Sequence, residues 1–588
     1  MKKIINIAVI AHVDAGKSTL VENLIQKTSN FKSDAVQELN FMDANQLEKE
    51  RGITIYSKNC AINYEDYRIN IVDTPGHADF SSEVERIIRT VDTVVLLVDC
   101  VEGPMPQTRF VLKMALKYNL KPIVVINKID KPEARTEEVL EEIYELFMEL
   151  DATDEQLAFP VLYGVTKLGS ISSEKKITDT MVDLLEAITK TYEGNDNQEE
   201  PLLFQVSTLA YDNYRGKLAI GKIYQGNLKV GEWVDMHDTE GNVTRRQVKS
   251  IQHYESTQAN DIERATAGDI VMISGISEIT IGDSLCEIGS NLSLPALTIE
   301  EPTLSVIIGV NGSALAGKEG SFLTSRQIYE RLMREIEVNV GLKVEQTDSA
   351  DRFKVFGRGE LHLSILLETM RREGYEFEVE NPKINYHEED GIIYEPYQRA
   401  YIDIPEMYQG AIMQAMHEKQ GILENIEHQG ERVIQEWCVP LKMLLGFRTE
   451  FITLTKGRGI MVSLFDGYKK KTSRESQRVN GSLISMTSGK SMSYPMFHLQ
   501  SRGYYFIGSQ ADVYPGMVVG IASKSKDLEI NITRNKRLNS FRGNGNGGKE
   551  EALKLKEPID LTLEYALAYI DGTEVVEITP KNIRIRKI

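Results

Sequence analysis

The sequence predicts a multidomain chain with α/β and α+β parts, and three observations support this fold class. Its 588 residues exceed what one hydrophobic core can organise, so we expect several domains. In the first third, short β-branched runs alternate with helical stretches, and closely spaced strands with glycine turns follow. Two later segments repeat one order of strands and helices. These changes of pattern divide the chain into five expected domains.

Residues 1–198 predict a doubly wound α/β domain. Runs such as IINIAVI and PIVVINK are typical of buried parallel strands, and stretches such as TRFVLKMALKYN between them have helical spacing. From Pro201 the strands come closer together and glycine turns separate them. This spacing predicts a β-barrel over residues 199–297.

The repeated segments, residues 301–385 and 391–476, each show the order strand, helix, strand, strand, helix, strand. This order predicts two ferredoxin-like βαββαβ domains. Residues 477–588 form the fifth expected domain, which is strand-rich and contains the basic, glycine-rich stretch RNKRLNSFRGNGNGGK.

Composition excludes several classes of protein. No apolar run is long enough to span a membrane, and no small-residue cleavage site follows the basic, apolar start, so a buried first strand is favoured over a signal peptide. The four cysteines are scattered, which argues against a disulfide framework or zinc site and fits a reducing cytoplasm. The net charge of −19 argues against indiscriminate nucleic-acid binding, so RNA contacts should come from local basic patches.

The stretch AHVDAGKST, residues 11–19, joins a predicted strand to a predicted helix. It matches the phosphate-loop pattern G-x-x-x-x-G-K-[ST], except that Ala11 replaces the first glycine. Gly16 would let the backbone approach the phosphates, Lys17 would reach the β- and γ-phosphates, and Ser18 would offer its hydroxyl to Mg²⁺. On this loop alone, a strand-to-helix turn that happens to contain Gly-Lys-Ser stays open. The residues expected to line the nucleotide here are Asp14, Ala15, Gly16, Lys17, Ser18 and Thr19.

The motif DTPGH follows the predicted strand RINIVD. Asp73 stands where a carboxylate can hold Mg²⁺ through water, and Gly76 can present its N–H to a γ-phosphate. His77 comes directly after it. A plain turn is the alternative for this motif alone, but it is disfavoured downstream of a phosphate loop.

The motif NKID follows the predicted strand PIVVI. Asp130 can accept two hydrogen bonds from the N1–H and N2–H₂ groups of guanine, a donor pair that adenine lacks. Asn127 would brace the loops, and the Lys128 stem would cover the base. The sequence therefore predicts a guanine nucleotide.

Together with RGITI, residues 51–55, these motifs resemble the P-loop GTP-binding domain of the translational GTPases. The resemblance implies that Thr54 closes on Mg²⁺ and the γ-phosphate. It also implies that Val13 and Ile53 form a hydrophobic gate beside His77, and that Asp14 helps to bind a monovalent cation. In LYGVTKLG, the places of the family's serine and alanine are held by Val165 and Thr166, and a backbone N–H of Thr166 could still meet guanine O6.

The resemblance extends along the whole chain. EPYQRAYIDIP begins almost directly after the first βαββαβ segment, so the tRNA-mimicking domain of elongation factor G and the tetracycline-resistance protection proteins is absent from the sequence. Runs such as VNGSLISMTSGKSMSYPMFHLQSRGYYFIG and NKRLNSFRG resemble the C-terminal domain of the BipA/TypA family. The chain is identified as a member of that family, although LKMLLGFRTEF departs from its usual lead into the second helix.

This resemblance implies a ribosome-dependent GTPase that hydrolyses GTP to GDP and phosphate, and acts in translation or large-subunit assembly under stress. Catalytic roles are implied for Lys17, Thr54 and His77, with His77 orienting the water. Ser18, Thr54 and Asp73 would hold Mg²⁺. The implied partners are the 70S ribosome and large-subunit rRNA at its GTPase-activating region, with tRNA as a further candidate. We expect a cytoplasmic, partly ribosome-associated monomer without membrane contact.

The basic C-terminal stretch is the candidate for rRNA contacts, through Lys536, Arg537 and Arg542. A solvated loop with a basic bias is the alternative. For the whole chain, a GTP-gated rRNA-binding chaperone, in which hydrolysis serves only release, stays open as a second hypothesis. A translocase or antibiotic-protection factor is disfavoured because the tRNA-mimicking domain is missing.

Overall fold

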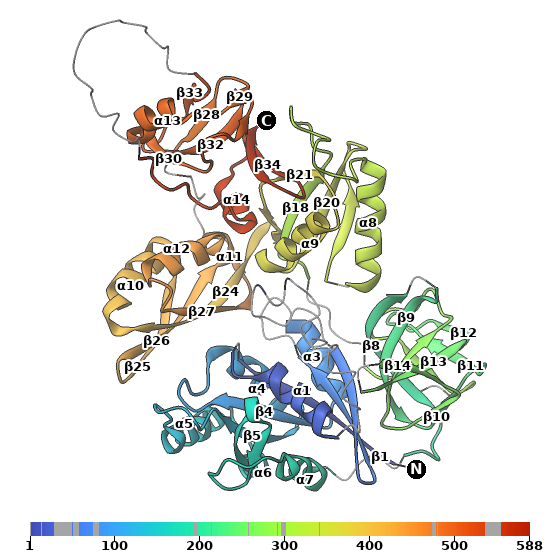
Figure 1. Cartoon of the computed structure of the whole chain (residues 1–588). Helices are drawn as coiled ribbons and strands as arrows, with labels where there is room; N and C mark the ends of the chain where they lie inside the picture. Colours follow the sequence, from blue (N-terminus) through green and yellow to red (C-terminus); the bar gives the residue numbers. More distant parts are fainter. Residues whose placement is uncertain are drawn as a thin grey trace, which may run out of the picture. The chain divides into compact units, whose positions relative to one another are not determined.

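A computed structural model describes most of the chain (Figure 1). The described residues are all 588 except 1, 13, 29–46, 48–49, 51–57, 75–80, 193–196, 213, 257, 291, 296–300, 340, 473–477, 479 and 535–553. The chain divides into two units. Unit one is Met1–Glu300 with Glu337–Val340, and unit two is Glu301–Ile336 with Gly341–Ile588.

The first part of unit one is a seven-stranded sheet in the order β2-β3-β1-β4-β5-β6-β7. Strands β3, β1, β4, β5 and β6 run parallel, and β2 and β7 lie antiparallel at the edges. Helices cover both faces, so the parallel strands consist of β-branched and other apolar residues, and every residue of β4 is buried. The strands are β1 (Lys3–Ala11), β2 (Lys58–Tyr64), β3 (Tyr67–Asp73), β4 (Thr93–Asp99), β5 (Lys121–Asn127), β6 (Val161–Val165) and β7 (Ser170–Ser172).

Two helical layers enclose this sheet. In β1, Ile5, Ile7 and Val9 pack into one core with α1 and α7, whereas Ala8 and Ile10 pack into the other with α3, α4 and α5. The alternation follows from the two-residue period of a strand. The helices are α1 (Lys17–Thr28), α3 (Ser81–Thr90), α4 (Pro106–Lys117), α5 (Thr136–Glu149), α6 (Asp154–Leu157), η3 (Thr166–Leu168) and α7 (Val182–Thr191).

The second part of unit one is a β-barrel. An eight-stranded antiparallel sheet, in the order β12-β11-β17-β8-β9-β16-β13-β14, surrounds a core that includes Phe204, Val234, Ile251 and Leu285. Strands β10 and β15 form a separate pair. The strands are β8 (Leu203–Asp212), β9 (Gly216–Gln225), β10 (Asn227–Lys229), β11 (Trp233–His237), β12 (Val243–Gln247), β13 (Ser250–Glu255), β14 (Gln258–Ile262), β15 (Arg264–Thr266), β16 (Ile270–Ser274) and β17 (Ser284–Cys286).

Polar contacts join the barrel to the seven-stranded sheet. Lys222 of β9 lies 2.6 Å from Asp92, and both side chains are buried. On the β2–β3 hairpin, Ala61 and Ser256 exchange backbone hydrogen bonds of 3.1 and 2.9 Å. The barrel therefore contacts the seven-stranded sheet at two places, just before β4 through Asp92 and on the β2–β3 hairpin through Ala61.

In unit two, an eleven-stranded sheet joins the first βαββαβ segment to the C-terminal segment. Its main path is β19-β20-β18-β21-β34-β35-β32-β28-β33, and the step between segments is the antiparallel pair β21–β34, with Phe377 opposite Ile578. The segments expected as separate domains therefore share a sheet and a core. The first segment contains β18 (Leu304–Gly309), α8 (Ser325–Val338), β19 (Lys343–Gln346), β20 (Arg352–Gly357), α9 (Glu360–Arg372), β21 (Phe377–Glu380) and β22 (Lys383–Ile384).

The C-terminal segment completes this sheet and adds a small two-stranded one, β29–β31. Its elements are β28 (Ser482–Ser485), β29 (Gly489–Lys490), α13 (Ser493–Leu499), η5 (Gln500–Arg502), β30 (Gly503–Tyr505), β31 (Asp512–Val513), β32 (Met517–Ala522), β33 (Leu528–Ile530), α14 (Leu563–Tyr569), β34 (Glu574–Ile578) and β35 (Ile583–Lys587).

The second βαββαβ segment has a five-stranded sheet with β24 at its centre, paired with β26 and β27. One face packs against α10 and α12 and buries Trp437 completely. The other face carries Arg399, Glu436 and Asp466 in an ion cluster. The elements are β23 (His387–Glu389), β24 (Ile392–Pro405), η4 (Glu406–Tyr408), α10 (Gln409–Glu418), β25 (Ile422–Gln429), β26 (Arg432–Pro440), α11 (Leu441–Leu444), α12 (Phe447–Leu454) and β27 (Ile460–Lys470).

Candidate nucleotide-binding site

The motifs of unit one gather at one edge of the seven-stranded sheet. The phosphate loop follows β1, Asp73 ends β3, Asn127 ends β5, and Thr166 follows β6. Because these strands are parallel, their carboxyl ends meet, which is where open α/β sheets bind ligands.

The phosphate loop has a left-handed backbone at Asp14 (φ 65°) and Gly16 (φ 100°). A Cβ at position 16 would lie 2.7 Å from Asn127 Nδ2 and 2.8 Å from Thr166 Oγ1, so the loop packs closely only with glycine there. The helix α1 starts at Lys17, so its N-terminal N–H groups face the loop. This arrangement suits an anion.

Lys17 lies against the end of β3. Its Nζ donates to the backbone oxygen of Thr74 at 2.5 Å and lies 3.0 Å from Asp73 Oδ1. The Asp73 side chain is only 1% exposed, and the Thr74 hydroxyl donates to Val9 O at 2.9 Å. The ammonium is therefore held between the phosphate loop and the carboxylate that we expect at the Mg²⁺ site.

Asn127 joins the phosphate loop to the loop after β6. Its amide nitrogen donates to Ala15 O at 2.7 Å and to Thr166 Oγ1 at 2.8 Å, and its amide oxygen accepts from Thr166 N–H at 2.9 Å. The residue is fully buried, so each of these bonds is shielded from water.

The Thr166 contacts bear on the expected guanine O6 contact. The N–H that we expected to meet O6 is donated to Asn127 in this structure. The Val165 side chain is buried in β6, so only its backbone could meet a base. The role of Thr166 that the sequence did not reveal is to hold Asn127 through both its N–H and its hydroxyl.

The NKID loop is shaped by Lys128, a non-glycine residue at φ 63°. Its Nζ lies 2.7 Å from Asp99, which Lys131 also approaches, at 3.2 Å. Although burial alone would raise it, the pKa of Asp99 is lowered, because Lys128, the Val101 N–H and Lys131 stabilise the carboxylate. Asp130 is exposed on this loop, so its carboxylate is accessible to a base.

Two residues of α1 that the motif analysis missed hold the loop after β6. Asn23 donates to Thr166 O at 2.9 Å, and Lys27 donates to Gly169 O at 2.6 Å. Their spacing of four residues puts them on one face of α1. The spacing of four residues is visible in the sequence. The loop that the two side chains contact is visible only in the structure.

A further unpredicted contact links the phosphate loop to the loop after β4. His12 Nε2 lies 2.7 Å from Glu102 Oε2. This hydrogen bond lowers the pKa of the Glu102 carboxyl. It therefore favours the ionised carboxylate beside the phosphate loop.

Ser18 and Thr19 lie in the first turn of α1. Several other predicted residues lie outside the part of the chain that the structure describes. The gate (Val13 and Ile53), the first-switch residue Thr54 and the pair Gly76 and His77 are among them. So are the predicted RNA-binding residues, Lys536, Arg537 and Arg542. Their roles stay predictions.

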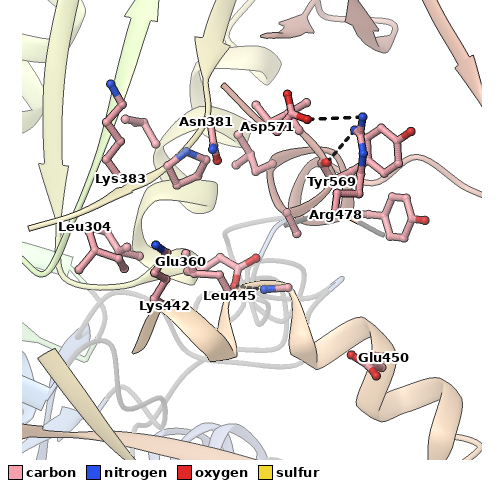
Figure 2. A pocket seen from close by; sticks show the side chains of 18 of the residues that line it. Leu304, Glu360, Asn381, Lys383, Lys442, Leu445, Glu450, Arg478, Tyr569 and Asp571 are labelled. Carbon is pink, nitrogen blue, oxygen red and sulfur yellow. Dashed lines mark hydrogen bonds and ion pairs between the residues drawn. The ribbon is translucent and has the colours of Figure 1, made fainter. Parts of the chain in front are cut away.

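Unit two contains a cavity of about 860 Å³, lined by both βαββαβ segments and the C-terminal segment (Figure 2). In its wall, Arg478 donates to Tyr569 O at 3.2 Å and lies 3.6 Å from Asp571. Glu360 accepts from Gly446 N–H at 3.2 Å. Of the described residues predicted for the nucleotide site, none lines this cavity.

In the described part of the chain, no helix combines the length and the apolar character that crossing a membrane requires.

Four family models match successive parts of the chain. They are the Elongation factor Tu GTP binding domain (residues 2–193), Elongation factor G domain 2 (202–288), Elongation factor G C-terminus (392–479) and the TypA/BipA C-terminal domain (480–588). A crystal structure of a Thermus thermophilus protein matches with a TM-score of 0.54 and 16% identity, covering 80% of this chain and 97% of that chain. At this identity it supports the fold alone. The predicted fold class is confirmed.

Curated relatives named "Large ribosomal subunit assembly factor BipA" match along their length. The Escherichia coli (strain K12) protein is 46% identical, covering 100% of this chain and 97% of its own. The Haemophilus influenzae protein is 46% identical, with coverages of 100% and 96%, and that of Buchnera aphidicola subsp. Schizaphis graminum 44%, with 99% and 96%. Full-length identity of this size and the GTP-binding domain confirm two predictions from the sequence: the chain is a GTPase, and it belongs to the BipA/TypA family of translational GTPases.

Proposed function

We propose that this GTPase is stimulated by the ribosome and acts in assembly of the large ribosomal subunit. Nucleotide binding is supported above all by the hydrogen bonds of Asn127. They join the phosphate loop and the loop after β6 into one cradle beside the exposed Asp130. The name of the full-length relatives supports the assembly role. Association with the ribosome, and through it a cytoplasmic location, is part of this proposal.

The residues present fit GTP with Mg²⁺. Gly16 leaves room that a Cβ would fill, and the Ser18 hydroxyl and Asp73 carboxylate offer hard oxygen ligands of the kind that Mg²⁺ prefers. Ser18 and Asp73 would hold the ion, together with Thr54. When bound, Mg²⁺ supplies positive charge that offsets the charge on the leaving phosphates. The exposed Asp14 would help to hold a monovalent cation.

The catalytic roles follow from the chain's own groups. Lys17 would exchange its contacts with Asp73 and Thr74 for oxygens of the β- and γ-phosphates. His77 would orient the attacking water, and the ribosome would supply the trigger, as activators do for other GTPases. Lys536, Arg537 and Arg542 would contact rRNA, and tRNA is a further candidate partner.

The first test measures GTP hydrolysis by the purified chain alone, with 70S ribosomes and with large-subunit precursors. We expect strong stimulation by the ribosomal particles. An Asp130→Asn variant should lose about 10- to 100-fold in affinity for GTP and gain affinity for xanthosine triphosphate, because the base's N1–H and N2–H₂ groups lose a charged acceptor. Glu133→Gln, which changes an exposed carboxylate on the same loop, is the matched control.

Slow hydrolysis that ignores every ribosomal particle would contradict the proposed partner but leave the nucleotide site intact. A His77→Ala variant then tests the assembly step. If excess variant restored subunit assembly in cells that lack the wild-type protein, hydrolysis would serve only release.

A further inference from the structure

The sulfur of Cys438 has an amine as its neighbour. Cys438 lies in β26 and Lys469 in β27, on the two sides of the central strand β24. Lys469 Nζ donates to Cys438 Sγ at 2.8 Å and to Asp466 Oδ2 at 2.8 Å. Cys438 is 2% exposed, whereas the Lys469 side chain is 43% exposed. The thiol is therefore covered by a side chain that itself reaches solvent.

The other three cysteines, all in the described part of the chain, have no side-chain amine among their hydrogen-bond partners. The thiols of Cys60, Cys100 and Cys286 donate to backbone carbonyl oxygens. Burial raises the pKa of each, that of Cys100 to about 11, so these thiols stay protonated and unreactive near neutral pH. In contrast, Cys438 Sγ contacts two side-chain groups, the Lys469 amine at 2.8 Å and the Asp466 carboxylate at 3.8 Å.

The charged groups around this pair form one cluster on the open face of the sheet. Asp466 Oδ2 lies 3.8 Å from Cys438 Sγ, and Arg399 lies 3.2 Å from the same carboxylate. Arg399 also pairs with Glu436 at 2.7 Å and Glu424 at 3.0 Å. Asp466 therefore contacts both the lysine amine and the sulfur.

We propose that Cys438 and Lys469 form a modification site, at which a peroxide produces a covalent sulfur–nitrogen crosslink. In the first step, the Cys438 sulfur attacks hydrogen peroxide, the O–O bond breaks, and a sulfenic acid and one water form. Sulfur loses two electrons, and the peroxide accepts them.

In the second step, the Lys469 ammonium first releases one proton to the solvent through Asp466, and the neutral amine then attacks the sulfenic sulfur. The S–N bond forms and the S–O bond breaks, as in the condensation of a sulfenic acid with a backbone nitrogen. The departing hydroxide leaves as water with a second proton from the nitrogen, and the third stays on nitrogen. In total, one thiol, one ammonium and one hydrogen peroxide give a sulfenamide, two waters and one proton.

The crosslink would join strands on opposite sides of β24. Cys438 and Lys469 are 31 residues apart, and the chain between them contains α11 and α12. A bond that closes this loop restricts the unfolded chain, so the oxidised segment should resist unfolding. It would also remove the positive charge that Lys469 contributes to the Asp466 cluster.

The test treats the full-length chain with hydrogen peroxide, digests it and analyses the peptides by mass spectrometry. We expect a peptide pair joined through Cys438 and Lys469 that is two hydrogen atoms lighter than the sum of its reduced parts, and that dithiothreitol separates. Cys286→Ser, which removes another buried thiol, should leave this product unchanged.

A Lys469→Arg variant keeps the positive charge beside Asp466 but lacks the nucleophilic amine. It should form no crosslink, and its Cys438 sulfenic acid should accumulate and be trapped by dimedone. Circular dichroism checks that the variant folds. Cys438 that stays a free thiol in the wild type, or that advances to sulfinic acid while Lys469 stays free, would overturn the proposal. So would a crosslink of equal yield in Lys469→Arg. GTP hydrolysis takes no part in these readouts.

Discussion

The two ends of the nucleotide site differ in how far their contacts are completed within the protein. At the guanine end, buried Asn127 makes three neutral hydrogen bonds to Ala15 and Thr166. At the phosphate end, the Lys17 ammonium lies against the Asp73 carboxylate and the Thr74 carbonyl. The first set can persist when a nucleotide binds, whereas the second must rearrange when phosphates arrive.

This difference distinguishes the end of the site that we expect to bind the base from the end that we expect to act on the phosphates. A cradle that is already hydrogen-bonded needs little reorganisation when a nucleotide enters. A lysine that is paired inside the protein acts on phosphate only after it exchanges partners. Variants at each end should therefore change different measurable quantities.

Lys17→Ala breaks the phosphate end and should have the largest effect. Without the Lys17 ammonium to stabilise negative charge on the transferring phosphate, ribosome-stimulated GTP hydrolysis should fall by about 100-fold or more. Single-turnover hydrolysis with saturating ribosomes measures this loss. Gln26→Ala, at an exposed position of the same helix, is the control. An equal loss in the control would show that α1 itself had been disturbed and would contradict the assignment to Lys17.

Asn127→Ala breaks the guanine end. It leaves the Ala15 carbonyl and the Thr166 N–H without their partner in a buried place, so the free energy of unfolding of unit one should fall by about 3 kcal/mol. Urea unfolding followed by circular dichroism measures this change, and nucleotide affinity should fall with it. Thr166→Val, which removes only the hydroxyl, should lose about 1 kcal/mol. Equal losses in the two variants would show that the Asn127 carboxamide is not the centre of the cradle.

The seven-stranded sheet was predictable because short stretches of sequence specify each of its buried strands. Buried parallel strands require β-branched runs, and the motifs at their carboxyl ends need few residues to be recognisable. The sequence therefore predicted that the motifs of Lys17, Asp73 and Asn127 each follow a buried strand. The pairing of β21 with β34 was not predictable, because Phe377 and Ile578 are far apart in the sequence and neither strand signals its neighbour.

Within the site, two of the missed residues, Asn23 and Lys27, share one property: each contacts a backbone whose path the sequence does not fix. Asn23 looks like an ordinary polar position on α1 until the loop after β6 is placed against it. The Thr166 N–H was expected to contact the base, but in the structure it donates to Asn127 Oδ1. Motifs identify the groups with chemistry, whereas side-chain to backbone bonds of this kind emerge only from the packing.

Asn23→Ala tests the guanine end with a smaller expected effect, on nucleotide affinity. It removes the hydrogen bond to Thr166 O and should weaken GDP binding by about fivefold, equivalent to about 1 kcal/mol, the usual net contribution of one such bond. Titration with a fluorescent GDP analogue measures it. Gln26→Ala, at an exposed position of α1, is the control. If hydrolysis by bound enzyme fell more than affinity did, Asn23 would act on the phosphate end instead.

The smallest expected effect is a pH dependence at the guanine end. The folded-state pKa of Asp99 is lowered from its ordinary value of 3.8, so its ion pairs with Lys128 and Lys131 contribute stability that is fully present above about pH 4. This contribution is lost as the pH falls through the folded-state pKa, because protonation removes the charge that pairs with Lys128 and Lys131. Thermal unfolding between pH 3 and pH 7 should therefore show a steeper loss in the wild type than in Asp99→Asn, whose amide keeps an acceptor for the Val101 N–H but cannot titrate. Parallel curves for the two proteins would show that the ion pairs do not support the loop, and that the bonds of Asn127 alone fix the position of Asp130.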